Sequence, residues 1–415
     1  MTICEKILAD KSGGKRVLPD QTVFAEVDLA CVDDVQISIF REKFDEISGQ
    51  VWDREKAVVI SDHYLPPSNI QQAESVRELK KFGIEYGLRH VFLNEGIKHQ
   101  VFRDWGLIVP GSIIAGTDSH MNTGGAFAAM AIGLGPTDIA AIFATGKNWF
   151  KVPRTIKLNL NGNLGPMIYA KDLALALLGK YGTEFARYKS IEFSGPLSKN
   201  LLLSDRMTLC NMSTEMGAKC AFFEFDVRTK DYAEKIGKSY TEVKPDEDAT
   251  YENIYSFEAF DLKPQIAIPG KPSNVYPVST LEGTEITQAY IGTCTNGNFE
   301  DLVEAAKILK GRRVHPAVKL IIIPASRSIY TRALEGGLLK IFMETGAIIC
   351  NPNCGPCVGM HQGILASNDI LLSTQNRNFK GRAGSINSQI YLASPATVAV
   401  SAIEGKITDP IKFLD

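Results

Sequence analysis

The cysteines of this sequence are concentrated near its C-terminus. Residues 350–359, CNPNCGPCVG, hold Cys350, Cys354 and Cys357, although the whole chain has only eight cysteines. A disulfide, a zinc site, a thiol redox pair and an iron–sulfur cluster would each use such a stretch. The spacing, C-x3-C-x2-C with a C-x2-C pair inside it, is compatible with each of these, so the choice depends on the rest of the chain.

The N-terminal sequence indicates the redox state of these thiols. MTICEKILADKSGGK carries Glu5 and Asp10 and lacks a long apolar core, which is unlike a secretory signal and unlike a transit peptide. The longest apolar runs, such as VKLIIIPA, are far shorter than the roughly 18 residues of a membrane span. We therefore predict a cytoplasmic protein with reduced thiols, in which disulfides are the least favoured use of the cysteines.

Zinc, redox and cluster chemistry remain for the cysteine stretch. Structural zinc usually takes two C-x2-C knuckles, and only one is present. A thioredoxin-like pair is typical of an early βα unit, and enzymes that cleave S-adenosylmethionine carry C-x3-C-x2-C in an early loop, with an aromatic residue where this chain has Pro356. The Gly and Pro neighbours suit a tight turn that directs several thiolates to one point. We favour a cluster with Cys294 as a further ligand; a buried structural role is the alternative.

The predicted strands end in polar residues. KAVVIS leads into Asp62 and His63, GSIIAG into TDSH at 117–120, and TQAYIG into Cys294. GAII leads into the cysteine stretch, and DILLS leads into TQNRNFKGR at 374–382. Near-continuous apolar strands that alternate with helical segments predict parallel sheets with helices on both faces, an α/β fold. Because ligands bind outside the carboxyl ends of such strands, we expect these polar residues to line one cleft.

Carboxylates stand beside histidines at two of these strand ends. In Asp62-His63 and in Asp118-Ser119-His120, a carboxylate next to an imidazole can hold the ring in one tautomer and tune it for proton transfer. A lone histidine such as His99 is as often structural as functional, so both roles stay open for it.

Arginines and amides follow the last of these strands. Arg377 and Arg382 are interleaved with Asn376 and Asn378. Arginines are usually surface charges, but directly after a buried strand these residues favour a clamp for a carboxylate ligand.

The composition limits the kinds of surface that the protein can have, and the linker segments indicate its domain boundaries. The 45 basic and 47 acidic residues leave a formal charge of −2, so nothing indicates a nucleic-acid or membrane surface. We predict domains over residues 1–152, 153–277 and 278–415, because KVPRTIKLNLNGN starts a new pattern and the Pro/Gly/Ser-rich segment 268–283 is typical of a linker. The acidic stretch 241–255 predicts a solvated loop.

Together these motifs resemble those of the aconitase superfamily and, within it, the large subunits of the isopropylmalate isomerase and homoaconitase branch. The stretches that carry the resemblance cover the chain from residue 57 onward: GTDSH, GPTDIAAIFATGKNWFKVP, CNMSTEMGAK, IGTCTNG, CGPCVG, STQNRNFKGR, IYLASP and GKITDP. The set is specific, although no single motif would suffice. The resemblance implies three α/β/α domains with largely parallel sheets around one [4Fe–4S] cluster bound by Cys294, Cys354 and Cys357, with Cys350 as a strand residue.

The resemblance also implies a role for each site residue. One iron of the cluster is not bound by cysteine and acts as a Lewis acid on the substrate. The implied catalytic residues are Asp62, His63, His99, Asp118, His120 and Glu215. The implied substrate-binding residues are Ser119, Asn211, Asn376, Arg377 and Arg382.

The reaction implied is that of a hydro-lyase, which moves a hydroxyl between adjacent carbons of a 2-hydroxy di- or tricarboxylate by dehydration and rehydration. The first substrate expected is 2-isopropylmalate, of leucine biosynthesis; the alternatives are homocitrate or homoaconitate, of lysine-type chain elongation, and then citramalate or dimethylmalate. Family members in one long chain carry a further mobile swivel domain that supplies a base, and we expect a separate small subunit to carry it here. Segment 31–40 departs from the family pattern, which leaves the substrate open.

Two other classes of protein are compatible with parts of the sequence. Some aconitases double as iron-sensing RNA-binding proteins, but the balanced charge and the lack of basic patches argue against that role. A zinc-stabilised scaffold would use the same cysteines, and the metal content of the protein separates it from an enzyme.

Overall fold

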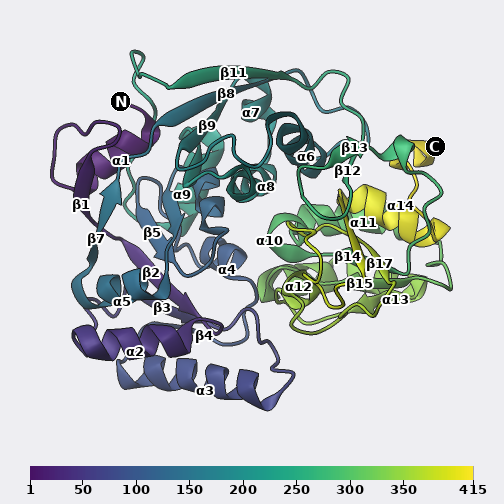
Figure 1. Ribbon diagram of the computed structural model, residues 1–415, viewed down its shortest axis with the longest axis horizontal. Coiled ribbons are helices and arrows are strands. Elements are labelled where there is room, and N and C mark those ends of the chain that lie inside the picture. The colour runs from purple at the N-terminus through teal and green to yellow at the C-terminus, as the bar shows by residue number, and fades with distance from the viewer. Residues whose placement is uncertain (415) are drawn as a thin grey trace. The chain divides into compact units, whose positions relative to one another are not determined.

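The computed structural model describes residues 1–414, and the chain forms two compact units of helices and strands (Figure 1). The first unit comprises Met1–Asn94, Val101–Asn161 and Glu184–Phe257. The second comprises Glu95–Gln100, Gly162–Thr183 and the chain from Glu258 onward.

The first unit is built on a five-stranded parallel sheet with the strand order β4-β3-β2-β5-β6. A four-stranded sheet, β10-β9-β8-β11, and an antiparallel ribbon of β1 and β7 complete the unit. The strands are β1 (Thr22–Glu26), β2 (Leu29–Asp33), β3 (Ala57–Ile60), β4 (His90–Phe92), β5 (Ile113–Gly116), β6 (Met130–Gly133), β7 (Lys147–Lys151), β8 (Thr155–Asn161), β9 (Ser190–Ser194), β10 (Cys220–Phe223) and β11 (Asn253–Glu258). The helices are α1 (Ile3–Lys11), α2 (Ile37–Ile47), α3 (Ile70–Glu85), α5 (Pro136–Thr145), α7 (Pro196–Asn200), α8 (Leu203–Met212) and α9 (Val227–Ile236), with the 3₁₀ helices η1 (Met121–Phe127) and η2 (Ser213–Met216).

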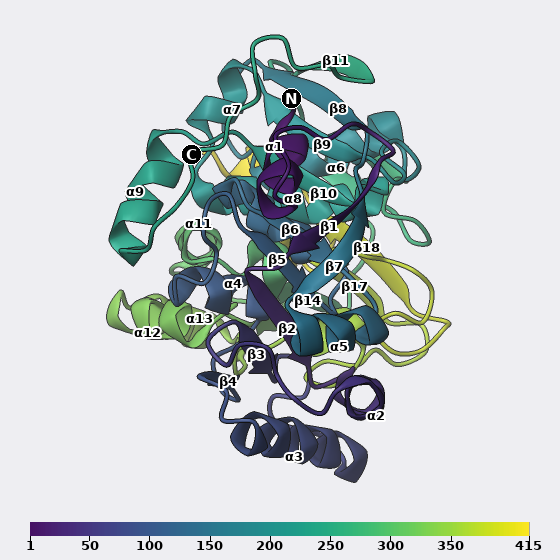
Figure 2. The same cartoon turned by 90° about the vertical axis from the view of Figure 1, so that its left-hand side faces the viewer.

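The central strands of the five-stranded sheet are buried. Strands β2, β3 and β5 are buried at every residue, as parallel strands covered by helices should be. Figures 1 and 2 show α2 and α3 side by side against this sheet. The rings of Phe40, Phe44, Phe82 and Phe143 meet edge to face between α2, α3 and α5. This packing holds the carboxyl ends of the strands in fixed places at one edge of the sheet.

The second unit is built on a seven-stranded sheet with the order β13-β12-β18-β17-β14-β15-β16. The pairs β14–β15, β14–β17, β15–β16 and β17–β18 are parallel, whereas β12 runs antiparallel to β13 and to β18. The strands are β12 (Gln265–Ala267), β13 (Val275–Pro277), β14 (Gln288–Ile291), β15 (Lys319–Ile322), β16 (Ile348–Ile349), β17 (Ile370–Ser373) and β18 (Gln389–Ala393). The helices are α6 (Ala170–Tyr181), α10 (Thr293–Asn296), α11 (Phe299–Leu309), α12 (Arg327–Glu335), α13 (Leu338–Thr345) and α14 (Pro395–Glu404), with the 3₁₀ helices η3 (Val278–Thr280), η4 (Gly355–Val358) and η5 (Pro410–Phe413). Helix α4 (Lys98–Asp104) begins in the second unit and ends in the first.

The α/β prediction is confirmed, and the strands expected ahead of the polar stretches are present as β3, β5, β14, β16 and β17. The predicted loop 241–255 is confirmed as far as Glu252, but its last three residues belong to β11, a mostly exposed strand that begins at Asn253 and lacks an apolar pattern. Strands β12 and β13 precede the predicted domain boundary at residue 278, but they belong to the same seven-stranded sheet as the strands that follow it. The three-domain division remains a prediction. Among residues 1–414, no helix combines the length and the apolar character that crossing a membrane requires.

A buried ion pair joins α8 to the start of α9. The Arg206 guanidinium, which is 1% exposed, donates to Asp226 from Nη1 (3.0 Å to Oδ1) and from Nη2 (2.5 Å to Oδ2). Asp226 also caps α9, since its Oδ1 accepts from the backbone N–H of Arg228 and of Thr229. Burial acts to raise the pKa of Asp226, but the hydrogen bond and charge of Arg206 outweigh it and lower that pKa.

We predict that Asp226→Ala lowers the free energy of unfolding by about 3 kcal/mol, because the Arg206 charge is left buried and unpaired. Since the folded pKa of Asp226 lies below the unfolded value of roughly 3.9, the pair stabilises the fold above that pH. The contribution is lost as the pH falls through the lowered pKa. Urea unfolding at neutral and acidic pH measures both effects.

The exposed pair between Arg187 and Glu184, at 3.0 Å, is the control. Glu184→Ala should change the free energy of unfolding by less than about 1 kcal/mol. Equal losses in the two variants would contradict the assignment of Asp226 to a buried pair.

Candidate functional site

Two buried aspartates end strand β2 at the centre of the first sheet. Asp34 Oδ2 accepts hydrogen bonds from Ser61 Oγ at 2.8 Å and from the backbone N–H of Tyr64 at 2.8 Å. His63 Nδ1 lies 2.9 Å from Asp62 Oδ1 and 3.4 Å from Asp34 Oδ1. The predicted Asp62-His63 pair therefore has a second buried carboxylate, from the neighbouring strand, on the same ring nitrogen.

Asp33 joins this group to the end of β5. The Thr117 hydroxyl donates to Asp33 Oδ2 at 2.6 Å, and the backbone N–H of Asp33 donates to Thr117 Oγ1 at 3.3 Å. Thr117 opens the TDSH segment, so the two predicted histidine motifs are connected through the end of the strand between them. The carboxyl ends of β3, β2 and β5 form one continuous polar edge.

His120 has a carboxylate near each ring nitrogen. Its Nε2 lies 2.8 Å from Glu215 Oε1, and its Nδ1 lies 3.6 Å from Asp118 Oδ1. The backbone N–H of His120 donates to the same Asp118 oxygen at 2.6 Å, which holds the loop in a tight turn. His120 and Glu215 are both buried, so the ring and the carboxylate are shielded from water.

Two predicted substrate-binding residues lie on the same loop or against it. Asn211, on α8, is buried and donates from Nδ2 to Thr123 Oγ1 at 2.8 Å. Thr123 in turn donates to the backbone carbonyl of His120 at 2.7 Å. Ser119 is exposed, and its Oγ lies 3.5 Å from His120 Nδ1. In the first unit the structure thus brings Asp118, Ser119, His120, Asn211 and Glu215 together.

In the second unit the predicted cluster ligands follow β14 and β16. Cys294 lies in α10, the single turn directly after β14. Cys354 is the N-cap residue of η4 and Cys357 lies inside this helix, where its backbone N–H donates to the Cys354 carbonyl at 3.1 Å. Cys350 lies one residue beyond β16, and its amide still continues the strand ladder to Ile322 at 3.0 Å.

The side chain of Tyr290 is close enough to these cysteines to interact with them electrostatically. Tyr290 lies on β14 and is fully buried, and its hydroxyl has no hydrogen-bond partner among residues 1–414. Burial raises the pKa of Tyr290, and so does the negative charge that Cys357, Cys354, Cys294 and Cys350 carry as thiolates. A buried donor without an acceptor is costly, so this hydroxyl fits a bound group with acceptor sulfur atoms. Three cysteines around such a donor fit an iron–sulfur cluster.

The turn between Tyr290 and Cys294 leaves no room for a side chain at position 292. A Cβ on Gly292 would lie 2.7 Å from Tyr290 Cε2 and 2.8 Å from the Ile323 carbonyl oxygen. The next residue, Thr293, has a φ of +79°, a left-handed conformation that is rare for a β-branched residue. Such strain often occurs at functional sites, and here it directs Cys294 out of the strand.

Two of the residues after β17 contact the same cysteines. Asn376 Nδ2 donates to Cys294 Sγ at 3.4 Å, and Arg382 Nε donates to the Cys357 carbonyl at 2.9 Å. The terminal nitrogens of Arg382 make no hydrogen bond or ion pair within residues 1–414, so they are available to an anion. Gln375 Nε2 donates a hydrogen bond to the backbone carbonyl of Arg377 at 2.6 Å.

His99 lies on a segment that packs at the end of β15. The backbone N–H of Ile97 donates to the Ala325 carbonyl, and that of Arg327 donates to the Glu95 carbonyl, both at 2.8 Å. His99 is 3% exposed. Its six-residue segment, Glu95–Gln100, belongs to the second unit.

Sequence reasoning did not single out Asp33, Asp34, Thr117 or Tyr290. The two aspartates carried the same signal that identified Asp62 and Asp118, because they directly follow the apolar run LACV. Tyr290 carried no local signal, since an aromatic residue inside a strand is typical of an apolar core.

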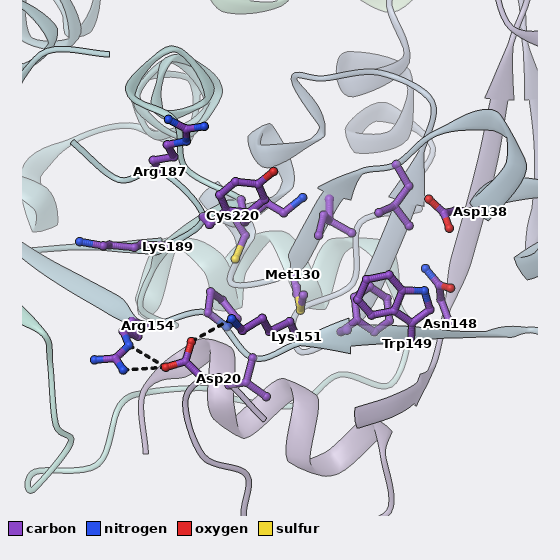
Figure 3. Close-up of a pocket in the computed structure, with 17 residues that line it drawn as sticks. Asp20, Met130, Asp138, Asn148, Trp149, Lys151, Arg154, Arg187, Lys189 and Cys220 are labelled. Atoms are coloured by element: carbon purple, nitrogen blue, oxygen red, sulfur yellow. Dashed lines mark hydrogen bonds and ion pairs between the residues drawn. The ribbon is translucent and has the colours of Figure 1, made fainter. Parts of the chain in front are cut away.

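The first unit contains a cavity of about 640 Å³ with an apolar floor and a cationic rim (Figure 3). Asp20 forms ion pairs at this rim with Lys151 at 3.2 Å and with Arg154 at 2.7 Å. None of the predicted site residues lines it. A smaller hollow of about 320 Å³ shares Leu134, Asp138 and Lys219 with the cavity and is lined by Thr117, Asp118 and Ser119. The chemistry-bearing loop therefore borders the smaller hollow.

Comparisons with known proteins show which proteins this chain is similar to. The aconitase family (aconitate hydratase) matches residues 5–405. The chain is 46% identical over 416 residues to the 3-isopropylmalate dehydratase large subunit 1 of Methanopyrus kandleri, covering 100% of this chain and 99% of that protein. It is 44% identical over 423 residues to the methanogen homoaconitase large subunit of Methanocaldococcus jannaschii, covering 99% of this chain and 100% of that protein. The crystal structure of Thermococcus kodakaraensis aconitase X in its holo form has the same fold, with a TM-score of 0.51, 15% identity and 93% of each chain covered.

We predict that Tyr290→Phe stabilises the cluster-free chain by about 1 kcal/mol, because it removes a buried hydroxyl that lacks an acceptor. The same change should speed loss of the cluster from the loaded chain. Urea unfolding of the cluster-free protein and release of iron to a chelator measure the two effects.

Tyr391→Phe is the matched control, because the hydroxyl of this buried tyrosine donates to Gln389 Oε1 at 3.3 Å. Its loss should destabilise the cluster-free chain slightly and leave iron release unchanged. Destabilisation of the cluster-free chain by Tyr290→Phe would show that its hydroxyl has another partner.

Proposed function

This chain is a member of the aconitase family, and on that premise we propose that it is the cluster-bearing large subunit of a hydro-lyase, a 3-isopropylmalate dehydratase. The observation that carries the proposal is the whole-length identity of 46% to a protein of that name. Homoaconitase is the second candidate, because a methanogen homoaconitase large subunit is 44% identical over nearly the whole chain. Both candidates isomerise a 2-hydroxy acid by dehydration and rehydration.

The residues that would hold the cluster are Cys294, Cys354 and Cys357. When bound, a [4Fe–4S] cluster with one iron free of cysteine supplies a Lewis acid to the substrate hydroxyl. Asn376 supports the assignment of Cys294, because its amide donates to that sulfur, and amide donors to sulfur are typical of cluster sites. The continued strand hydrogen bond of Cys350 supports a structural role for that residue.

The histidine–carboxylate groups of the first unit serve proton transfer. His63 has two carboxylates on Nδ1, which favours the tautomer with the proton on Nδ1 and makes Nε2 the nitrogen that exchanges a proton with the substrate. His120 is oriented by Glu215 and Asp118, so it can deliver a proton and recover it without moving. Ser119 and Asn211 lie on or against the same loop and are assigned to the substrate. His99 is assigned a further catalytic role with the cysteines.

Arg377 and Arg382 recognise the substrate carboxylates. Guanidinium groups pair with carboxylates through two parallel hydrogen bonds, which fixes the orientation of a small dicarboxylate. Asn376 and Arg382 each contact a cysteine of the predicted cluster, so the anion would be bound directly beside the metal.

A separate small subunit completes the enzyme. The relatives are named large subunits, which implies a partner chain. We propose that the partner carries the mobile domain with the base that takes the carbon-bound proton, and that it closes over the substrate and excludes water. We also place the enzyme in the cytoplasm, where thiols stay reduced and able to bind iron.

We predict that protein purified without oxygen contains about four irons per chain. Cys294→Ser, Cys354→Ser and Cys357→Ser should each abolish this content, because each removes one thiolate ligand. Cys350→Ser, the matched control within the same stretch, should retain the iron. Metal and sulfide analysis of the four variants tests the ligand assignment. Zinc in place of iron would contradict it.

We predict that the cluster-loaded chain alone turns over no 2-isopropylmalate and gains activity when its small subunit is added. The reason is that the base for the carbon-bound proton lies on the partner. Turnover is measured with 2-isopropylmalate, homocitrate and citramalate, with and without the partner. Preference for homocitrate would favour the second candidate, and full turnover by the single chain would refute the two-chain assignment.

A further inference from the structure

Helix α6 carries a fully buried lysine at its second residue. Lys171 is 0% exposed. Its Nζ donates to Thr295 Oγ1 at 3.2 Å, to the Thr374 carbonyl at 2.8 Å and to the Gln375 carbonyl at 3.0 Å. An ammonium group has three N–H donors, one for each of these contacts. The geometry therefore indicates a charged lysine in the interior.

The acceptors of Lys171 lie on two different strand-end loops. Thr295 follows β14 in α10, next to Cys294, and Thr374 and Gln375 follow β17, just ahead of Asn376 and Arg377. One ammonium group thus joins the loop of a predicted cluster ligand to the loop of the predicted carboxylate clamp.

A short chain of hydrogen bonds continues from Lys171 to sulfur. The Thr295 hydroxyl, which accepts from Lys171, lies 3.3 Å from Asn376 Oδ1. Asn376 Nδ2 then donates to Cys294 Sγ at 3.4 Å. The buried positive charge and the sulfur are therefore linked through two polar side chains, both of them also buried.

The adjacent acid does not serve as the counter-charge. Asp172 Oδ1 accepts from the backbone N–H of Gln265 at 2.8 Å, and its Oδ2 accepts from that of Tyr169 at 2.9 Å, which caps α6. Burial raises the pKa of Asp172 to about 7, so much of this carboxyl is neutral near neutral pH. The three contacts described above place the Lys171 ammonium group against the two loops.

We propose that Lys171 is a positioning residue for the cluster: it fixes the Cys294 loop against the Asn376 loop and supplies a positive charge to the sulfur ligands. The proposal rests on the cluster assignment above. A cluster held by three thiolates is anionic and becomes more so on reduction, so a buried cation beside it favours the reduced form. The same cation stabilises the thiolates against loss of iron.

The test compares cluster-loaded Lys171→Met with wild type, because methionine keeps the length of the side chain and removes the charge. The midpoint potential of the cluster should become more negative. Iron release to a chelator should be about tenfold faster, the usual scale for loss of a group that supports a metal ligand. Lys180→Met, on the exposed end of the same helix, is the matched control and should change neither quantity.

Thr295→Val separates positioning from charge, since it breaks the hydrogen-bond chain and leaves the lysine in place. It should speed iron release and leave the potential close to that of wild type. An unchanged potential and unchanged iron release in Lys171→Met would overturn the proposal. Should Lys171→Met fail to fold, unchanged iron release in Thr295→Val would overturn it instead.

The outcomes distinguish this proposal from the proposed function. If wild-type protein binds the cluster but isomerises none of the three acids, the substrate assignment is contradicted. The role of Lys171 is then still decided by the midpoint potential and the rate of iron release. Wild-type protein that binds no cluster contradicts both.

Discussion

Polar groups buried away from water need partners, and in each unit this demand shapes the loops that carry the candidate site residues. In the first unit, Asp34 is buried at the end of β2 and is satisfied by Ser61 and Tyr64 from the end of β3. In the second unit, Lys171 is satisfied by the loops after β14 and β17. Asp34 and Lys171 therefore each hold two strand ends together. The loops that follow these strands, which contain the predicted site residues, are held in place by the same hydrogen bonds.

The two units carry different kinds of chemistry. The edge of the five-stranded sheet holds imidazoles flanked by carboxylates, which suits proton transfer. The seven-stranded sheet holds sulfur, amides and cations, which suits a metal group and an anionic substrate. Hydration and dehydration need both, because removal of a hydroxyl requires a group that polarises the C–O bond and a group that protonates the oxygen.

Much of this arrangement was accessible from the sequence, because parallel strands are coded locally by apolar runs and their ends by polar residues. Asp62, Asp118 and Cys294 were found this way, and the structure places them directly after strands. Lys171 was not found, since a lysine in the first turn of a helix is typical of a surface. Its burial depends on β14 and β17, which are distant in sequence, and the carboxylate that Asp34 brings to His63 likewise comes from a distant part of the sequence.

The packing around Gly292 also has an evolutionary meaning. Its missing side chain faces two walls, the ring of Tyr290 and the backbone of Ile323. A smaller residue at position 290 would remove the first wall and leave the second, which no substitution can move because it is main chain. We therefore expect any sequence that keeps this backbone path from β14 into Cys294 to keep glycine at position 292, whichever substrate it accepts.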